Sequence, residues 1–158
     1  MKVFKDYYNN EVTLSFDDHP FSKKPKHVWV ICRYDNKWLL THHKDRGIEF
    51  PGGKVEEGET AEEAAVREVQ EETGGHCETI DYIGQYYVDG KAGKIVKNVY
   101  YAEVKYLEKQ SSYFETYGPV LLDKLPVHVA SDAAFSFMMK DEVLPSSLEI
   151  IEELPFFR

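Results

Sequence analysis

Residues 53–75 read GKVEEGETAEEAAVREVQEETGG and contain the clearest helix signal in the chain. Thr60 is a good N-cap, and Glu63 three residues later completes the pattern of a capping box. Gly74 is well placed to end the helix, which is therefore predicted over residues 60–73. The residues just before this stretch, Phe50-Pro51-Gly52-Gly53, are predicted to form a turn that cannot continue a strand.

One side of this predicted helix carries three glutamates, Glu68, Glu71 and Glu72. At 100° per residue their side chains fall within about 100° of one another. Carboxylates this close repel each other unless a cation neutralises them. Their hard oxygen atoms suit Mg²⁺ or Mn²⁺ rather than zinc. The alternative is a solvated acidic helix, which charge alone favours.

The spacing of the whole stretch resembles the Nudix box. Gly53 is followed after five residues by Glu59 and after seven more by Arg67-Glu68-Val69-Gln70-Glu71-Glu72-Thr73-Gly74, and only Gly75 departs by replacing an aliphatic residue. The resemblance implies an α+β fold, an α/β/α sandwich with a central mixed β-sheet, the box as a loop-helix-loop and C-terminal helices. It also implies that a divalent metal assists hydrolysis of a nucleoside diphosphate linked to another group.

The resemblance further implies roles for individual residues. Glu68, Glu71, Glu72 and the main-chain oxygen of Gly52 would be ligands of Mg²⁺ or Mn²⁺. Glu59 and Arg67 would pair to hold the loop to the helix, with Gly53 and Gly74 as structural glycines, and Arg67 would also orient a catalytic carboxylate. A bound metal would offset the charge that builds up at phosphorus and would activate the attacking water.

Many relatives use a further glutamate from a loop beyond the box. Glu115 fits this role best because a strand is predicted to follow it over residues 118–123, and Glu103 and Glu108 are the alternatives. Glu115 would be a metal ligand or the general base. Either Glu68 both supports the metal and takes the proton of the attacking water, or Glu115 is the base and Glu68 is only a ligand.

The remainder of the chain predicts strands before and after the box and helices at the end. The pattern predicts an N-terminal hairpin over residues 3–16 within an extension over 1–26, and strands over 27–33, 37–41, 77–88, 94–106 and 118–123. Helices are predicted over 132–140 and 146–153, separated by Leu144-Pro145. This order favours a mixed sheet packed by helices.

Length and charge limit the classes of function. A chain of 158 residues fits one domain over residues 1–158, and 19 Lys and Arg against 28 Asp and Glu give a net charge of −9. This charge argues against binding a DNA duplex through its phosphates, although a metal would still admit a polyphosphate. Two cysteines allow neither a disulfide framework nor a four-thiolate zinc site. Without a signal peptide or an apolar run of membrane length, we expect a cytoplasmic protein with no membrane contact, and no protein partner is indicated.

Outside the box the chain resembles the YtkD group of MutT-like Nudix proteins from Gram-positive bacteria. The matching segments are Lys5-Asp6-Tyr7-Tyr8, residues 26–33, 113–121 and 135–141. The resemblance implies a nucleoside triphosphate diphosphohydrolase that acts on oxidised guanine nucleotides such as 8-oxo-dGTP, or an RNA pyrophosphohydrolase that acts on 5′-triphosphate ends. The alternatives are hydrolysis of a dinucleoside polyphosphate or nucleotide sugar, and a non-catalytic ligand sensor. Intact box glutamates argue against the sensor.

Basic and aromatic residues are the candidates for substrate binding. The stretch from His42 to Arg46 precedes the glycine turn, and within and beyond it His43, Arg46 and Lys54 are predicted to contact phosphates. Phe114 and Phe137 are the first candidates to stack on a base. Further aromatic candidates are Tyr87, Tyr117 and Phe135. For each of these residues a solvated loop position or a place in the core is the alternative.

Overall fold

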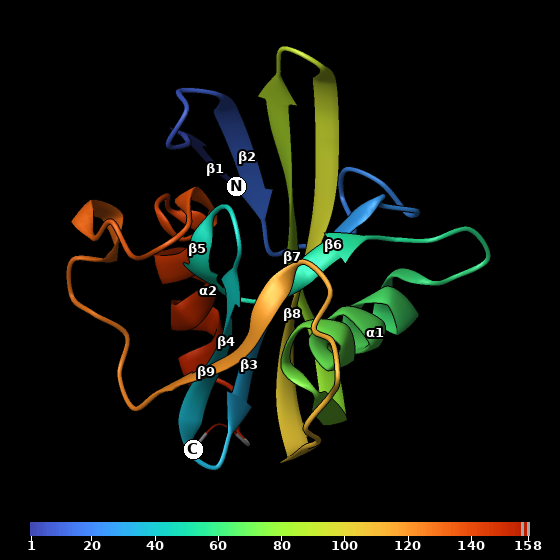
Figure 1. Cartoon of the computed structure of the whole chain (residues 1–158). Coiled ribbons are helices and arrows are strands. Elements are labelled where there is room, and N and C mark those ends of the chain that lie inside the picture. The colour runs from blue at the N-terminus through green and yellow to red at the C-terminus, as the bar shows by residue number, and fades with distance from the viewer. Residues whose placement is uncertain (156, 158) are drawn as a thin grey trace.

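Strand β3 (His27–Tyr34) lies at the centre of the sheet because every residue from Val28 to Cys32 is buried. A strand that is apolar on both faces needs cover on both sides. A computed structural model describes residues 1–155 and 157, in which α1 (Ala61–Thr73) covers one face of the sheet and α2 (Val143–Glu152) the other (Figure 1). This arrangement confirms the predicted α+β sandwich.

The sheet of the described chain has nine strands. Seven follow one another in space as β1 (Lys2–Lys5), β2 (Glu11–Ser15), β7 (Gly75–Gly90), β8 (Gly93–Leu107), β3, β4 (Lys37–His43) and β5 (Gly47–Glu49). Strand β6 (Gly52–Lys54) also pairs with β3, and β9 (Thr116–Leu122) pairs with β4. The β3–β8 pair is parallel and its antiparallel neighbours make the sheet mixed, as predicted.

The predicted N-terminal hairpin is confirmed as β1 and β2. Strand β2 pairs with β7, so the hairpin extends the central sheet. This continuity supports our proposal that residues 1–158 form one domain, although residues 156 and 158 lie outside the described residues. Neither α-helix of the described chain has the length and apolar character needed to cross a membrane.

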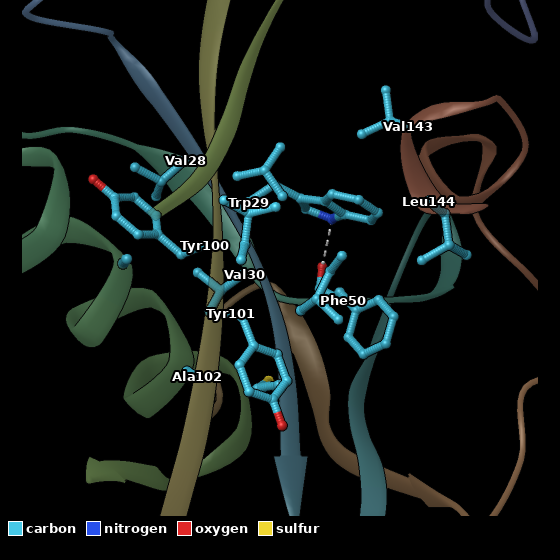
Figure 2. Close-up of a cluster of buried hydrophobic side chains, with 14 of the residues drawn as sticks. Val28, Trp29, Val30, Phe50, Tyr100, Tyr101, Ala102, Val143 and Leu144 are labelled. Carbon is cyan, nitrogen blue, oxygen red and sulfur yellow. Dashed lines mark hydrogen bonds between the residues drawn. The ribbon is translucent and has the colours of Figure 1, made fainter. Parts of the chain in front are cut away.

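Alternating side chains of β3 build a core on each face of the sheet. Trp29 packs edge to face against Phe50, and its Nε1 donates a 3.2 Å hydrogen bond to the Phe50 carbonyl. Figure 2 shows this pair on the side of Val143 and Leu144 from α2, and Val30 on the opposite side toward α1. Both helices are thus fixed to the same central strand.

The glycine turn differs from its prediction, because Gly52–Lys54 form strand β6 against β3. The chain does break at Phe50-Pro51, but β3 offers an open edge to the residues that follow. Glycine suits this close approach, since a Cβ on Gly52 would lie 2.4 Å from the Val28 carbonyl oxygen.

The predicted helix over residues 132–140 is wrong. The segment contains one short 3-10 helix, η2 (Phe137–Met139), and another, η1 (Val129–Ser131), ends just before it. The Asp132 carboxylate accepts from the Ala134 amide, and the Ser136 hydroxyl accepts from the Met138 amide. These side chains take backbone donors in a way that competes with a helix.

The second C-terminal helix is present but begins earlier than predicted. Helix α2 spans Val143–Glu152, so Leu144-Pro145 lies inside its first turn instead of separating two helices. Proline is tolerated there because a first-turn N–H has no partner within the helix. The C-terminal region therefore contributes a single α-helix among the described residues.

Candidate active site

Helix α1 forms as its sequence predicts. The Thr60 hydroxyl accepts from the Glu63 amide at 3.1 Å, and the Glu63 carboxylate accepts from the Thr60 amide at 3.0 Å. The helix ends at Gly74, whose φ of 77° is left-handed. The capping box and the glycine stop are therefore confirmed, and they fix the register in which the glutamates face the sheet.

The inner face of α1 carries both apolar and acidic side chains. Ala64, Ala65 and Val69 are fully buried, while Glu72 is buried and the Glu68 side chain is only 14% exposed. Small alanines bring the helix close to the sheet. As a result, two carboxylates of α1 lie at the edge of the core.

Glycines of β6 make room for these carboxylates. A Cβ on Gly53 would lie 2.5 Å from Oε2 of Glu68, so only glycine allows the carboxylate to take this position. The Gly52 amide donates a 2.9 Å hydrogen bond to Oε1 of Glu72. Strand β6 and helix α1 therefore pack closely together, and the backbone of Gly52 and Gly53 lies directly against the two carboxylates.

Arg67 joins the loop to the helix through an ion-pair network. Its Nε donates to Glu59 at 2.7 Å, and its Nη1 lies 2.6 Å from Oε1 of Glu68 and 3.1 Å from Oε2 of Glu71. Its Nη2 donates to Glu59 and to the Lys54 carbonyl. The Glu59–Arg67 pair that the family resemblance implies is present, and the same guanidinium orients two of the candidate metal ligands.

Glu115 reaches the same cavity from the loop before β9. Its side chain is 81% exposed, and one oxygen lies 3.8 Å from Nε2 of His43. The next residue, Thr116, donates a 3.1 Å hydrogen bond to the Glu72 carbonyl, which ties the loop to the end of α1. The alternatives lie elsewhere, because Glu103 accepts from the Tyr101 hydroxyl and Glu108 pairs with His76.

The candidate glutamates and basic residues line one cavity of about 670 Å³. On its acidic side are Glu68, Glu71, Glu72 and Glu115, and elsewhere on its wall are Arg46, Lys54, Phe114 and Phe137, all predicted from sequence. Gly52 and Gly53 also line it. The structure therefore brings together nearly all of the predicted site residues.

His43 is the exception among the predicted substrate contacts. It is buried and does not line the cavity. Its Nδ1 accepts from the backbone amides of Asp45 and Arg46, at 3.1 and 3.2 Å, which turns the ring into the loop. Because His43 is buried beside Glu115, we expect it to position that carboxylate and not to contact the substrate directly.

Three of the other aromatic candidates also lie outside the cavity. Phe135 is buried in the core, and Tyr87 packs edge to face against Phe21. Tyr117 is exposed, with His42 against its ring and the Lys44 ammonium 5.8 Å from its centroid. Phe114 and Phe137 are thus the aromatic candidates that border the cavity.

The cavity also contains residues that sequence reasoning missed, including Lys97, His27 and Glu49. Lys97 stands directly opposite His27 in the parallel β3–β8 register, a juxtaposition that no spacing along the chain reveals. Nδ1 of His27 is buried without a hydrogen-bond partner in the described chain. Glu49 is buried and takes a bidentate pair from Arg46 at 3.0 and 2.8 Å, so Arg46 is only partly available to a substrate.

Burial shifts the protonation of several groups in this cavity. Burial raises the pKa of Glu68 to about 7 against the opposing effect of Arg67, and that of Glu72 to about 9 against its hydrogen bond from Gly52. Burial also lowers the pKa of Lys97 to about 8, and lowers that of His27 with help from Lys97 and Lys54. Charge of either sign is thus costly here without a compensating ligand.

The donor set suits a divalent cation. Among residues 1–155 and 157, no three His, Cys, Asp or Glu side chains converge as a preformed metal centre, because Arg67 draws Glu68 and Glu71 to itself. However, Oε2 of Glu68 and Oε2 of Glu72 have no hydrogen-bond partner in this part of the chain. Free carboxylate oxygens in a space that Gly53 keeps open are the ligands that Mg²⁺ and Mn²⁺ prefer.

Comparisons with known proteins place this chain beside characterised families. The model of the NUDIX domain matches residues 23–116. The chain is 61% identical over 153 residues, 97% of each protein, to YtkD of Bacillus subtilis (strain 168), which is named as a candidate 8-oxo-dGTP diphosphatase.

Solved structures extend the comparison to the fold. The crystal structure of the pyrophosphohydrolase BsRppH from Bacillus subtilis, in its E68A form, matches with a TM-score of 0.98 and 59% identity over 100% of both chains. A NUDIX hydrolase from Nitrosomonas europaea matches with a TM-score of 0.64 over 82% of this chain and 89% of that one. At 19% identity this second similarity shows a common fold only.

Proposed function

The chain belongs to the NUDIX family and is a hydrolase of phosphoric anhydrides, and we propose that its substrates are the 5′-triphosphate ends of nucleotides and of RNA. The observation that carries the proposal is the cavity itself, in which the four candidate ligands Glu68, Glu71, Glu72 and Glu115 meet basic side chains from Lys54, Lys97 and Arg46. The basic side chains can bind anionic phosphates, and the carboxylates can bind a cation. The similar Bacillus subtilis proteins are named as a candidate 8-oxo-dGTP diphosphatase and as a pyrophosphohydrolase, and both names describe cleavage of a phosphoric anhydride.

Nudix hydrolases generally need a divalent metal, and we propose Mg²⁺ or Mn²⁺ for this chain. The residues proposed to hold it are Glu68, Glu71, Glu72 and Glu115 with the main-chain oxygen of Gly52. When bound, the cation would offset the charge of the phosphates and make water a better nucleophile.

We assign the proton transfer to Glu68. Its carboxylate is largely buried, and Arg67 holds one of its oxygens while the other stays free. A pKa of about 7 places this group where it can accept a proton from water near neutral pH. Glu115 is hydrated and approaches from a loop, which fits a ligand that completes the site when substrate binds.

Phosphate binding is proposed for the basic wall of the cavity. Lys54 and Lys97 stand on β6 and β8, on either side of His27 from β3. Their charges would hold the outer phosphates while Phe114 and Phe137 border the space for the nucleoside. The cytoplasm stays the expected compartment, in keeping with the free thiols Cys32 and Cys77.

A competition assay tests this function. The wild-type protein is given Mg²⁺ with 8-oxo-dGTP, GTP and a short 5′-triphosphate RNA in one tube, and kcat/KM is measured for each. We expect pyrophosphate or stepwise orthophosphate as the product from at least one of them. Hydrolysis of a dinucleoside polyphosphate or a nucleotide sugar instead, with no release from any triphosphate, would overturn the proposal.

A further inference from the structure

The main-chain carbonyls at the end of α1 lack partners within the helix. The Gly74 amide donates to the Gln70 carbonyl at 2.8 Å and closes the last turn. The carbonyls of Glu71 and Glu72 must therefore find donors outside the helix. Both residues also carry side chains that line the acidic side of the cavity. Whatever binds their carbonyls therefore acts on the position of two candidate metal ligands.

The chain on either side of Glu115 supplies these donors where it passes the end of α1 (Figure 1). Before Glu115, Nε2 of Gln110 donates a 3.2 Å hydrogen bond to the Glu71 carbonyl. After Glu115, the Thr116 hydroxyl donates a 3.1 Å hydrogen bond to the Glu72 carbonyl. Two consecutive ligand candidates of the helix are thus bound, through their carbonyls, to the segment that carries Glu115.

The Thr116 hydroxyl is buried at the centre of this contact. It also accepts from the Gly118 amide at 3.1 Å, and the Tyr113 carbonyl lies 3.3 Å away. The Thr41 hydroxyl of β4 lies 2.9 Å from the Glu72 carbonyl and 3.0 Å from the Gly118 carbonyl. Because a buried carbonyl left unpaired costs free energy, these two hydroxyls fix the end of α1 against the start of β9.

Glu72 connects the helix and the loop through its two ends. Its carboxylate accepts from the Gly52 amide at 2.9 Å inside the cavity, while its carbonyl binds Thr116. The Glu115 side chain is 81% exposed, and its near neighbour, Nε2 of His43, lies 3.8 Å away. A side chain held so loosely depends on its backbone for its position. The hydroxyl next to it is therefore well placed to set where Glu115 stands relative to Glu72.

We propose that Thr116 and Gln110 are positioning residues, which hold Glu115 in register with Glu71 and Glu72 by binding the carbonyls at the end of α1. This inference rests on the proposed function, in which Glu115 completes the site. Without these bonds the Glu115 carboxylate would occupy a wider range of positions and would meet the bound phosphates less often. The effect of removing them should therefore pass through Glu115.

A double-mutant cycle tests this dependence. Thr116→Val removes the hydroxyl at nearly constant size, and kcat for GTP with Mg²⁺ is measured in the wild-type and Glu115→Ala backgrounds. We expect kcat to fall about tenfold in the wild-type background and to change by less than about twofold where Glu115 is already absent. A defect of the fold alone would lower kcat by the same factor in both backgrounds, and that result would overturn the proposal.

Matched variants assign the effect to the hydrogen bonds. Thr116→Ser keeps the hydroxyl and should keep kcat within about twofold of the wild type, whereas Gln110→Ala should lower kcat only where Glu115 is present. Thr79→Val makes the same change at an exposed position of β7 and should leave kcat unchanged. A kcat of Thr116→Ser as low as that of Thr116→Val would overturn the role of the hydroxyl.

Hydrogen exchange of the metal-free protein tests the same bonds without any reaction. Amide exchange over residues 108–118 is measured by mass spectrometry, and exchange in β3 reports whether each variant is folded. We expect exchange in this segment to be at least about tenfold faster in Thr116→Val and unchanged in Thr116→Ser. Equal exchange in Thr116→Val and the wild type would overturn the proposal. Absence of hydrolysis of any triphosphate by the wild type would instead contradict the proposed function.

Discussion

Helix α1 and the loop before β9 both supply carboxylates to one cavity, but they do so in opposite ways. The α1 side chain of Glu68 is 14% exposed, whereas the loop side chain of Glu115 is 81% exposed. Burial makes the charged form of Glu68 costly, so the helix carries Arg67 beside it. The Glu115 side chain lies mostly in water, with one oxygen 3.8 Å from Nε2 of His43. We call α1, with its buried Glu68, the rigid half of the site, and the loop before β9, with its exposed Glu115, the hydrated half.

The two regions also differ in what holds them. Helix α1 is fixed by its own cap and glycine stop. The loop depends on neighbours, because Thr116 binds the Glu72 carbonyl and the Lys44 amide donates to the Glu115 carbonyl. Phe114, next to Glu115, has a left-handed φ of 62°, which is unusual for a bulky residue. The loop is therefore held both by its own hydrogen bonds and by contacts to the end of α1 and to Lys44 just after β4.

The largest effect is expected from Glu68→Gln, which tests the rigid half directly. The amide keeps the size of the side chain and one acceptor for Arg67 but cannot take a proton. Loss of a general base lowers kcat by about 10² to 10⁴-fold, and circular dichroism should show an unchanged fold. Glu62→Gln, at an exposed position of the same helix, is the control. Full activity in Glu68→Gln would remove Glu68 from the catalytic role.

Arg67→Ala should destabilise the rigid half more than any change in the loop. The substitution leaves Glu59, Glu68 and Glu71 without their common cation. We expect a loss of about 2 kcal/mol in the free energy of unfolding, measured by urea denaturation, because the network is only partly exposed. Arg67→Lys keeps the charge but not the forked geometry and should recover only part of the loss. Equal stability of wild type and Arg67→Ala would show that the network does not hold loop to helix.

The stability of the metal-free protein should fall as pH rises. The pKa of Glu72 is raised from an ordinary 4.5 to about 9, so the folded protein binds this proton more tightly than the unfolded chain. The resulting stabilisation is fully present below pH 4.5 and is lost as pH rises toward 9. Between pH 6 and 7.5 we expect a loss on the order of 2 kcal/mol in chelator-treated protein, since each pH unit in this range costs about 1.4 kcal/mol.

Glu72→Gln provides the matched variant for this pH dependence. The amide keeps an acceptor for the Gly52 amide but does not titrate. Its unfolding free energy should vary less with pH than that of the wild type, and added Mg²⁺ should raise the stability of the wild type more than that of the variant. Identical pH profiles would show that Glu72 does not carry the buried proton.

Glu115→Ala should have the smallest effect of the series and tests the hydrated half. We expect kcat to fall about tenfold, or about 1.4 kcal/mol of barrier, with no change in unfolding free energy because the side chain is mostly in water. Glu78→Ala, at an exposed position on β7, is the control. A loss well below tenfold would exclude Glu115 from the catalytic set, and a loss as large as that of Glu68→Gln would erase the distinction between the two regions.

Two segments of the chain depart from the structure that their local sequence favours because distant partners compete with the local signals. Residues 132–140 looked helical, yet the backbone of Ile48 bonds to Ala134 and Ser136 and holds the segment against β5. Gly52 and Gly53 looked like a turn, yet the open edge of β3 makes them part of a strand. In both cases the hydrogen bonds that determine the backbone conformation come from residues remote in sequence.

The sequence by itself determined the helix of residues 60–73 and the spacing of its glutamates, because capping and helical periodicity act over a few residues. It also placed Gly53 and Arg67 where the carboxylates need them. Only the tertiary structure decided that Lys97 stands beside His27, that His43 turns away from the cavity, and that Tyr8 meets Phe137. Those contacts depend on strand register and sheet order, which link residues far apart in the chain and follow from the packing of the whole core.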